Sequence, residues 1–170
     1  MELLISSYRG IGPLKFDMEK KDARGVLGDD FITESMIAEP GKTRDLYTSK
    51  GLHIQYNKSE KIEFIDILRN AEPVFLNKRL FYESFEDILT FFKSIDQEIE
   101  IDDDGILSIK YGIGIYSPQS GNDKRIIETI YIFKQDYYSN DSSFKLNDYL
   151  MENKPRTVQD LKNMAGIEWH

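Results

Sequence analysis

The stretch GLHIQYNKSEKIEFIDIL, residues 51–68, decides the fold because a second stretch, GIGIYSPQSGNDKRIIETIYIF at residues 112–133, matches it. In both stretches apolar side chains alternate with polar ones on either side of a polar turn, which is the pattern of two antiparallel strands. The glycines that open the stretches are 61 positions apart, whereas Ile62 and Ile127, after the turns, are 65 apart. The extra residues fall in the second turn, where a change of length is tolerated. The sequence therefore predicts two equivalent strand pairs.

A short amphipathic helix is predicted ahead of each strand pair. Each helix has an apolar trio with the i, i+3, i+4 spacing of one helix face, and the trios are Ala23, Val26 and Leu27, and Ile88, Phe91 and Phe92. Asp17 precedes the first helix and Gly28 can end it, while Ser84 followed by Asp87 is a capping-box pattern. Helices of about three turns need a sheet to pack on.

Together these elements predict an α+β fold class, in which two helix-plus-antiparallel-strand repeats at about residues 10–70 and 77–138 form one core. A chain of 170 residues has the length of one typical domain, so residues 1–140 are predicted to be a single domain. Residues 141–170 begin in a polar linker and continue in two helical patterns that break at Pro155. We expect them to form a short helical C-terminal tail that packs on the domain or else contacts a partner.

Composition restricts the class of partner and the compartment. The chain has 30 acidic and 22 basic residues and a net charge of -8, which opposes binding to nucleic acid phosphates. The absence of cysteine excludes disulfides, thiolate zinc sites and cysteine nucleophiles, and favours the cytoplasm. The apolar run in MELLISSYRG, residues 1–10, is too short for a signal peptide or a membrane span. We expect a cytoplasmic protein with neither nucleic acid nor membrane as a direct partner.

The most acidic stretch is DQEIEIDDDGILSIKY, residues 96–111, with six carboxylates in its first nine positions. Its alternation predicts a hairpin with a three-residue loop at 103–105, in which Gly105 is left-handed and Ile99 and Ile101 face the core. The expected pairs are Ile101 with Leu107, Ile99 with Ile109, and Glu98 with Lys110. This register leaves four carboxylates without a role in folding: Glu100, Asp102, Asp103 and Asp104.

Metal and enzyme chemistry are not predicted. The segment EIDDDG, residues 100–105, imitates the start of a calcium loop, but Tyr111 stands where calcium needs a bidentate acid. Carboxylates that alternate along an exposed strand stay solvated and do not acquire the separated pKa values of a catalytic pair. His53 alternates with apolar neighbours, which indicates a surface or cross-strand role. We predict no catalytic residue, no cofactor and no metal, and the acids are either a solvated edge that blocks aggregation or a docking face for a basic partner.

The segment YIFKQDYYSND, residues 131–141, is a second candidate contact surface. Tyr137 and Tyr138 stand beside Asp136, and aromatic anchors with charges around them are common at protein interfaces. The alternative is that one tyrosine covers the core and the other covers backbone.

The helix segment FDMEKKDARGVLGDD, residues 16–30, is similar to the Met-x-x-x-x-apolar-x-x-x-Leu-Gly helix of the β-lactamase inhibitor proteins and of small outer-membrane lipoproteins with the same unit. Gly25 inside the helix departs from that pattern. The resemblance covers about residues 12–133 and implies a tandem helix-and-sheet architecture, and it does not extend to the tail.

In its size, acidity and lack of cysteine the chain also resembles the immunity proteins that bacteria encode beside polymorphic or contact-dependent growth inhibition toxins. The resemblance implies a non-enzymatic inhibitor whose partner is a cognate protein toxin with a basic nuclease (RNase) domain. The alternatives are a non-enzymatic interaction or assembly module of the same architecture and, as a third interpretation, a hydrolase, and the oligomeric state is left open. The predicted partner-binding residues are Glu98, Glu100, Asp102, Asp103, Asp104, Asp136, Tyr137 and Tyr138.

Overall fold

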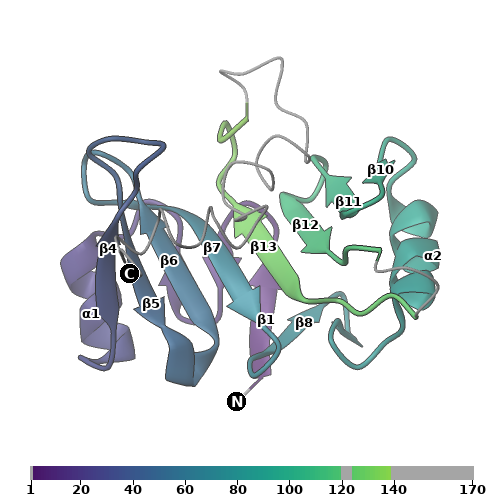
Figure 1. Cartoon of the computed structure of the whole chain (residues 1–170), viewed down its shortest axis with the longest axis horizontal. Coiled ribbons are helices and arrows are strands. Elements are labelled where there is room, and N and C mark those ends of the chain that lie inside the picture. Colours follow the sequence, from purple (N-terminus) through teal and green to yellow (C-terminus); the bar gives the residue numbers. More distant parts are fainter. Residues whose placement is uncertain (1, 120–123, 139–170) are drawn as a thin grey trace, which may run out of the picture.

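The computed structural model describes residues 2–119 and 124–138, which form two β-sheets with short helices (Figure 1). Within these ranges there are thirteen strands and only two α-helices, which have 8 and 11 residues. The fold is therefore β-rich, and the predicted α+β class of balanced helix-and-strand repeats is wrong. The error arises because three of the strands have only two residues, too few to show an alternating pattern. The predicted tail, residues 141–170, lies outside the described residues.

The larger sheet has eight antiparallel strands in the order β10-β11-β12-β13-β7-β6-β5-β4. One half consists of β4 (Ile32–Ser35), β5 (Thr43–Tyr47), β6 (Leu52–Tyr56) and β7 (Ile62–Leu68). The other half consists of β10 (Glu100–Asp102), β11 (Gly105–Ser108), β12 (Ile113–Tyr116) and β13 (Thr129–Phe133). Each half is a meander of consecutive strands, and β7 pairs with β13 where the halves meet.

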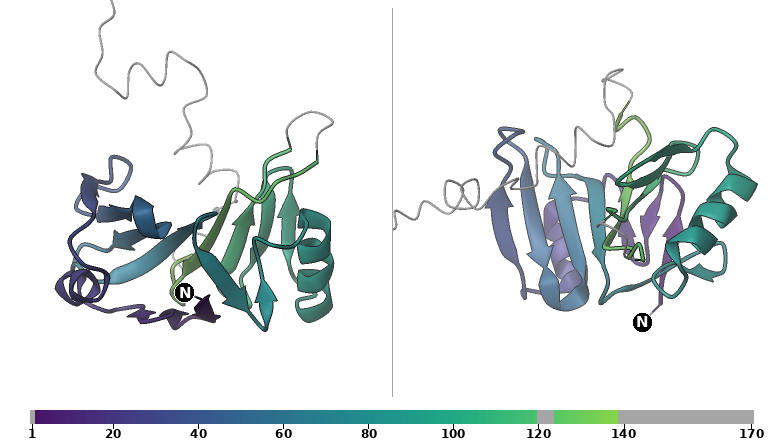
Figure 2. Two further views of the ribbon diagram at one scale, coloured as in Figure 1. Left: turned by 90° about the horizontal axis from the view of Figure 1, so that it is seen from below. Right: turned by 45° about the vertical axis from the view of Figure 1, so that its right-hand side comes forward.

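The smaller sheet covers one face of the larger one. Its strands are β3 (Leu14–Lys15), β2 (Gly10–Ile11), β1 (Glu2–Ser6), β8 (Glu72–Phe75) and β9 (Lys78–Arg79), in that order. β1 and β8 run parallel and the other pairs are antiparallel. The helices α1 (Lys20–Leu27) and α2 (Phe85–Ile95) lie on the same side, at opposite ends of the large sheet (Figure 2).

The two strand pairs expected from the matching stretches are confirmed. β6 and β7 are antiparallel with Leu52 opposite Ile67, and β12 and β13 are antiparallel with Ile113 opposite Ile132. The two glycines that open the stretches have left-handed φ angles of 68° and 66°. The halves of the large sheet therefore meet as equivalent hairpins.

The main core lies between the large sheet and the elements that cover it. Isoleucines of the central strands are completely buried: Ile54, Ile65, Ile115 and Ile130. α1 adds Ala23, and α2 adds Phe85, Ile88 and Phe92. The predicted start of α2 and the predicted end of α1 are found, because the Ser84 hydroxyl accepts a hydrogen bond from the Asp87 N–H, and Gly28, with a φ of 84°, ends α1. The predicted start of α1 after Asp17 is wrong by two residues, because Glu19 is the residue that precedes the helix.

A buried ion pair fastens α1 to the edge of the large sheet. Asp45 on β5 is fully buried, and its two oxygens accept hydrogen bonds of 2.9 Å from the Arg24 guanidinium. The Thr33 hydroxyl on β4 donates a third bond of 2.6 Å to Asp45. Burial raises the pKa of Asp45, but the bonds from Arg24 and Thr33 outweigh it, so this pKa lies below its usual value. The carboxylate therefore stays charged and holds the helix in place.

The opposite face of the large sheet carries a second, aromatic cluster. Phe64, Leu107, Tyr131 and Phe133 are buried there, and three partly buried tyrosines pack on them: Tyr8, Tyr137 and Tyr138. We call this surface the aromatic face.

Candidate functional site

The negative charge of the chain is concentrated at one end of the large sheet. Residues 85–119, from α2 through β12, contain eight acidic and two basic residues, which leaves -6 of the net charge of -8. β10 is the edge strand there, and it pairs with β11 alone among the described strands. The hairpin of β10 and β11 is called the acidic hairpin below.

The acidic hairpin is confirmed, but its predicted register is wrong by one residue. Ile101 pairs with Ile106 and Asp102 pairs with Gly105, so the loop has two residues, 103 and 104. A Cβ atom on Gly105 would overlap the carbonyl oxygen of Ile115, so this glycine serves the close approach of β12 rather than the loop. The Asp102 carboxylate closes the loop by accepting hydrogen bonds of 2.9 Å from the N–H groups of residues 104 and 105.

The register shift changes the roles expected for the neighbouring side chains. Ile101 is 46% exposed instead of buried in the core, although Ile99 does pack against the core. Lys110 does not pair with Glu98, because its ammonium group donates to the carbonyl oxygen of Ile95 at 2.7 Å. Because Glu100 pairs with Leu107, a residue of the aromatic cluster, Glu100 lies on the aromatic face.

Internal hydrogen bonds fix the position of the acidic hairpin. The Asp96 carboxylate, 2% exposed, accepts a bond of 2.6 Å from the Ser108 hydroxyl and one of 3.0 Å from the Glu98 N–H. The Arg125 guanidinium lies over the Phe85 ring, with 3.8 Å between its central carbon and the ring centroid, and it donates a hydrogen bond of 3.1 Å to the carbonyl oxygen of residue 103. Asp96 and Arg125 therefore act inside the molecule and hold the neighbouring acids in place.

Three of the predicted acids are exposed, Glu98, Glu100 and Asp103, and two are partly buried, Asp102 and Asp104. The ion pairs found among residues 2–119 and 124–138 include none of these five carboxylates. Their negative charge is therefore not neutralised by the described part of the chain.

The predicted tyrosines lie on the aromatic face as its outer layer. The ring of Tyr138 packs edge-on against the ring of Phe133, with 4.6 Å between the ring centroids, and the ring centroids of Tyr137 and Phe64 lie 5.1 Å apart. The Tyr137 hydroxyl accepts a hydrogen bond of 3.2 Å from the Gln55 side-chain amide. Burial raises the pKa of both tyrosines above its ordinary value, so both stay neutral. Each tyrosine is partly exposed, so it covers the aromatic cluster and can also touch a partner.

One row of paired residues connects the acidic hairpin with the centre of the aromatic face. Glu100 pairs with Leu107, which pairs with Gly114, which in turn pairs with Tyr131. Gly114 is needed there, because a Cβ atom would overlap the Tyr131 ring. The structure thus brings Glu100 and the tyrosines onto one face. Asp136 instead lines a separate hollow of about 600 Å³ with Tyr8, Arg9 and Lys134.

The same row continues to Asp66, which the sequence analysis missed. Asp66 on β7 pairs with Tyr131 on one side and with His53 on the other, so His53 has the expected cross-strand position. Burial raises the pKa of Asp66 to about 6, although the positive charge of Arg44 opposes this. Burial and the charge of Arg44 lower the pKa of His53. The signal in the sequence was the one acid within the apolar run FIDIL, residues 64–68.

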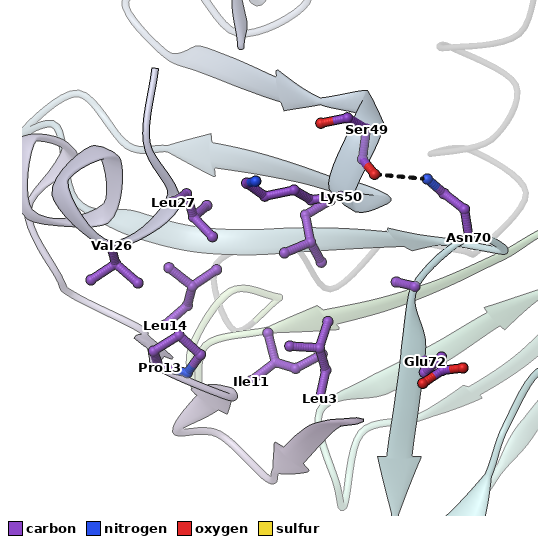
Figure 3. Close-up of a pocket in the computed structure, with 12 residues that line it drawn as sticks. Leu3, Ile11, Pro13, Leu14, Val26, Leu27, Ser49, Lys50, Asn70 and Glu72 are labelled. Carbon is purple, nitrogen blue, oxygen red and sulfur yellow. Dashed lines mark hydrogen bonds between the residues drawn. The ribbon is translucent and has the colours of Figure 1, made fainter. Parts of the chain in front are cut away.

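A cavity of about 540 Å³ lies between α1 and the smaller sheet (Figure 3). Leu3, Ile11, Leu14 and Leu27 form its apolar wall, and Lys50 and Glu72 stand at its polar rim. None of the predicted partner-binding residues lines this cavity, so it is a separate feature.

Within residues 2–119 and 124–138, no group of three or more His, Asp or Glu side chains is placed to hold a metal ion. Neither described helix has the length and apolar character needed to cross a membrane. Comparison with protein-family models, with curated proteins and with solved structures found no match to this chain. Function is therefore inferred from the residues of the molecule itself.

Proposed function

We propose that this protein is a cytoplasmic immunity protein, a non-enzymatic inhibitor that binds a cognate protein toxin with a basic nuclease (RNase) domain. The observation that carries the proposal is the acidic hairpin with its exposed, unneutralised carboxylates, on a segment that holds -6 of the net charge of -8. Glu100 shares the aromatic face with Tyr137 and Tyr138, so charge and aromatic anchors are available to one partner.

The physical basis is competition for the cations of the nuclease. A ribonuclease holds phosphate with Lys, Arg and His, and a fixed array of carboxylates binds the same groups. Because Asp96, Ser108 and Arg125 hold the hairpin, little side-chain or loop ordering is required when the complex forms. Long-range attraction also increases the association rate by about ten- to a thousandfold. Fast capture is what a cell needs against a toxin that acts inside it.

The test is co-expression of the full chain with the toxic product of an adjacent gene. We expect the chain to restore growth and to co-purify with an inactive variant of that toxin at a fixed stoichiometry. A variant with Glu98, Glu100 and Asp103 reversed to Lys should lose protection while it stays folded by circular dichroism. Full protection by that variant, or the absence of any complex with a toxic neighbour, would overturn the proposal.

A further inference from the structure

Asp66 is a carboxylate for which the described part of the chain supplies no hydrogen-bond donor and no ion pair. It is partly buried near the centre of the large sheet, on the aromatic face. Loss of water around an ionised carboxylate without a compensating partner costs stability, so such a group requires an explanation.

The cation and the polar groups around Asp66 either bind another residue or lack hydrogen-bond partners among the described residues. Arg44, the cation that influences Asp66, donates to Glu34 at 3.0 Å instead. The Arg44 Nε atom is buried and has no hydrogen-bond partner among the described residues. His53, on the next strand, makes no hydrogen bond within the described ranges. Three adjacent strands, β5, β6 and β7, thus present hydrogen-bonding groups without a described partner on the same face.

Aromatic rings form the other side of the Asp66 environment. Tyr131 is the cross-strand neighbour of Asp66. The negative charge of Asp66 adds to the effect of burial in raising the pKa values of Tyr137 and Tyr138. A carboxylate beside aromatic rings attracts a cationic side chain twice, through its own charge and through the electron-rich ring faces. Anions and neutral groups gain neither interaction.

We propose that Asp66, with His53 and the neighbouring tyrosines, is a binding site for a cationic side chain, a guanidinium or ammonium group, of the protein partner. This inference rests on the proposed function and adds a second contact to it. Asp66 on β7 and Glu100 on β10 are four strand spacings apart, which is about 19 Å. An interface of standard size is about 30 Å across, so one partner surface can reach both carboxylates.

The first experiment measures the stability of the full chain, and it needs no toxin. The folded-state pKa of Asp66 is raised, so its carboxyl group stabilises the fold below the unfolded pKa and loses that contribution as the pH rises through about 6. We expect Asp66→Asn to raise the melting temperature at neutral pH and to flatten the pH dependence between about 4 and 6. The exposed acid Glu128 serves as the control, and Glu128→Gln should change neither. A lower melting temperature for Asp66→Asn would show that the carboxylate is a structural group and would overturn the proposal.

The second experiment measures binding with a defined probe. N-acetyl-arginine amide is titrated into the labelled full chain, with N-acetyl-citrulline amide as the uncharged isostere, and amide NMR signals are followed. We expect saturable shifts at residues 53 and 66 with the arginine compound alone, and their loss in Asp66→Asn. No arginine-specific shift, shifts confined to the acidic hairpin, or shifts that persist in Asp66→Asn would each refute the site. Because the arginine compound takes the place of the toxin, this titration tests the Asp66 site even if the chain proves not to act as an immunity protein.

Discussion

Reversal of two exposed acids of the hairpin, Glu100→Lys with Asp103→Lys, isolates electrostatic steering from contact energy. The double variant changes the net charge from -8 to -4 because each reversal adds two positive units. Neither side chain takes part in an ion pair among the described residues, and Asp103 uses only its backbone carbonyl internally. The fold therefore loses no described side-chain contact, and the change falls on the approach of a partner.

The expected magnitude follows from Coulomb's law. One cation of the partner about 10 Å from the hairpin interacts with each unit charge by about 0.4 kcal/mol in water. Four units of charge then amount to about 1.7 kcal/mol without salt, which screening reduces to about 0.6 kcal/mol at 0.1 M ionic strength. For each such cation the association rate should fall about sevenfold in 10 mM salt and about threefold in 0.1 M salt.

The assay is stopped-flow association with the inactive toxin at several salt concentrations. The matched control is Asp22→Lys with Asp29→Lys, which gives the same net charge at the α1 end of the sheet, far from the hairpin (Figure 1). We expect the control to retain most of the rate and of its salt dependence. Equal slowing in both variants would mean that net charge alone matters, and an unchanged rate in the hairpin variant would place the interface elsewhere.

Two further predictions concern the framework that holds the site. Arg24→Met leaves the buried Asp45 without its cation, and urea unfolding should show that the free energy of unfolding falls by about 3 to 5 kcal/mol. The double variant with Asp45→Asn should lose less stability than the sum of the two single variants. Additive losses would contradict a coupled pair. Gly114→Ala places a methyl group into the Tyr131 ring, so we expect a loss of about 1 to 3 kcal/mol and a changed near-ultraviolet circular dichroism spectrum. Gly25→Ala, in an open position on α1, is the glycine control and should be neutral or stabilising by about 0.5 to 1 kcal/mol.

The parts of the fold that were predicted correctly depend on patterns that are local in the chain. The strand pairs at residues 51–68 and 112–133 alternate over enough residues to be recognised, and the cap of Ser84 needs only a partner three residues away. The smaller sheet was missed because three of its five strands, β2, β3 and β9, have only two residues each. The contact of β1 with β8, which joins the two parts of that sheet, pairs residues about 70 positions apart, and no local pattern records it.

The candidate site shows the same division between local and distant causes. The acids and tyrosines were identified by type and clustering, and Glu100 does share a face with Tyr138. The register failed because Gly105 was assigned to the loop, whereas its conformation serves the approach of β12. Asp66 was missed because its importance comes from neighbours on two other strands, which the sequence separates from it by many residues.

The arrangement of the large sheet also has a consequence for the kinetics of folding. Strands β4 to β7 and strands β10 to β13 are each paired with neighbours along the chain, so either meander can form with short loop closures. The contact of β7 with β13 joins residues about 65 positions apart and bears the larger closure entropy. We expect the meanders to form early and their docking to limit the folding rate. Asp66 and Tyr131 lie on that docking seam, so the cation site of this protein would be assembled in the last step of folding.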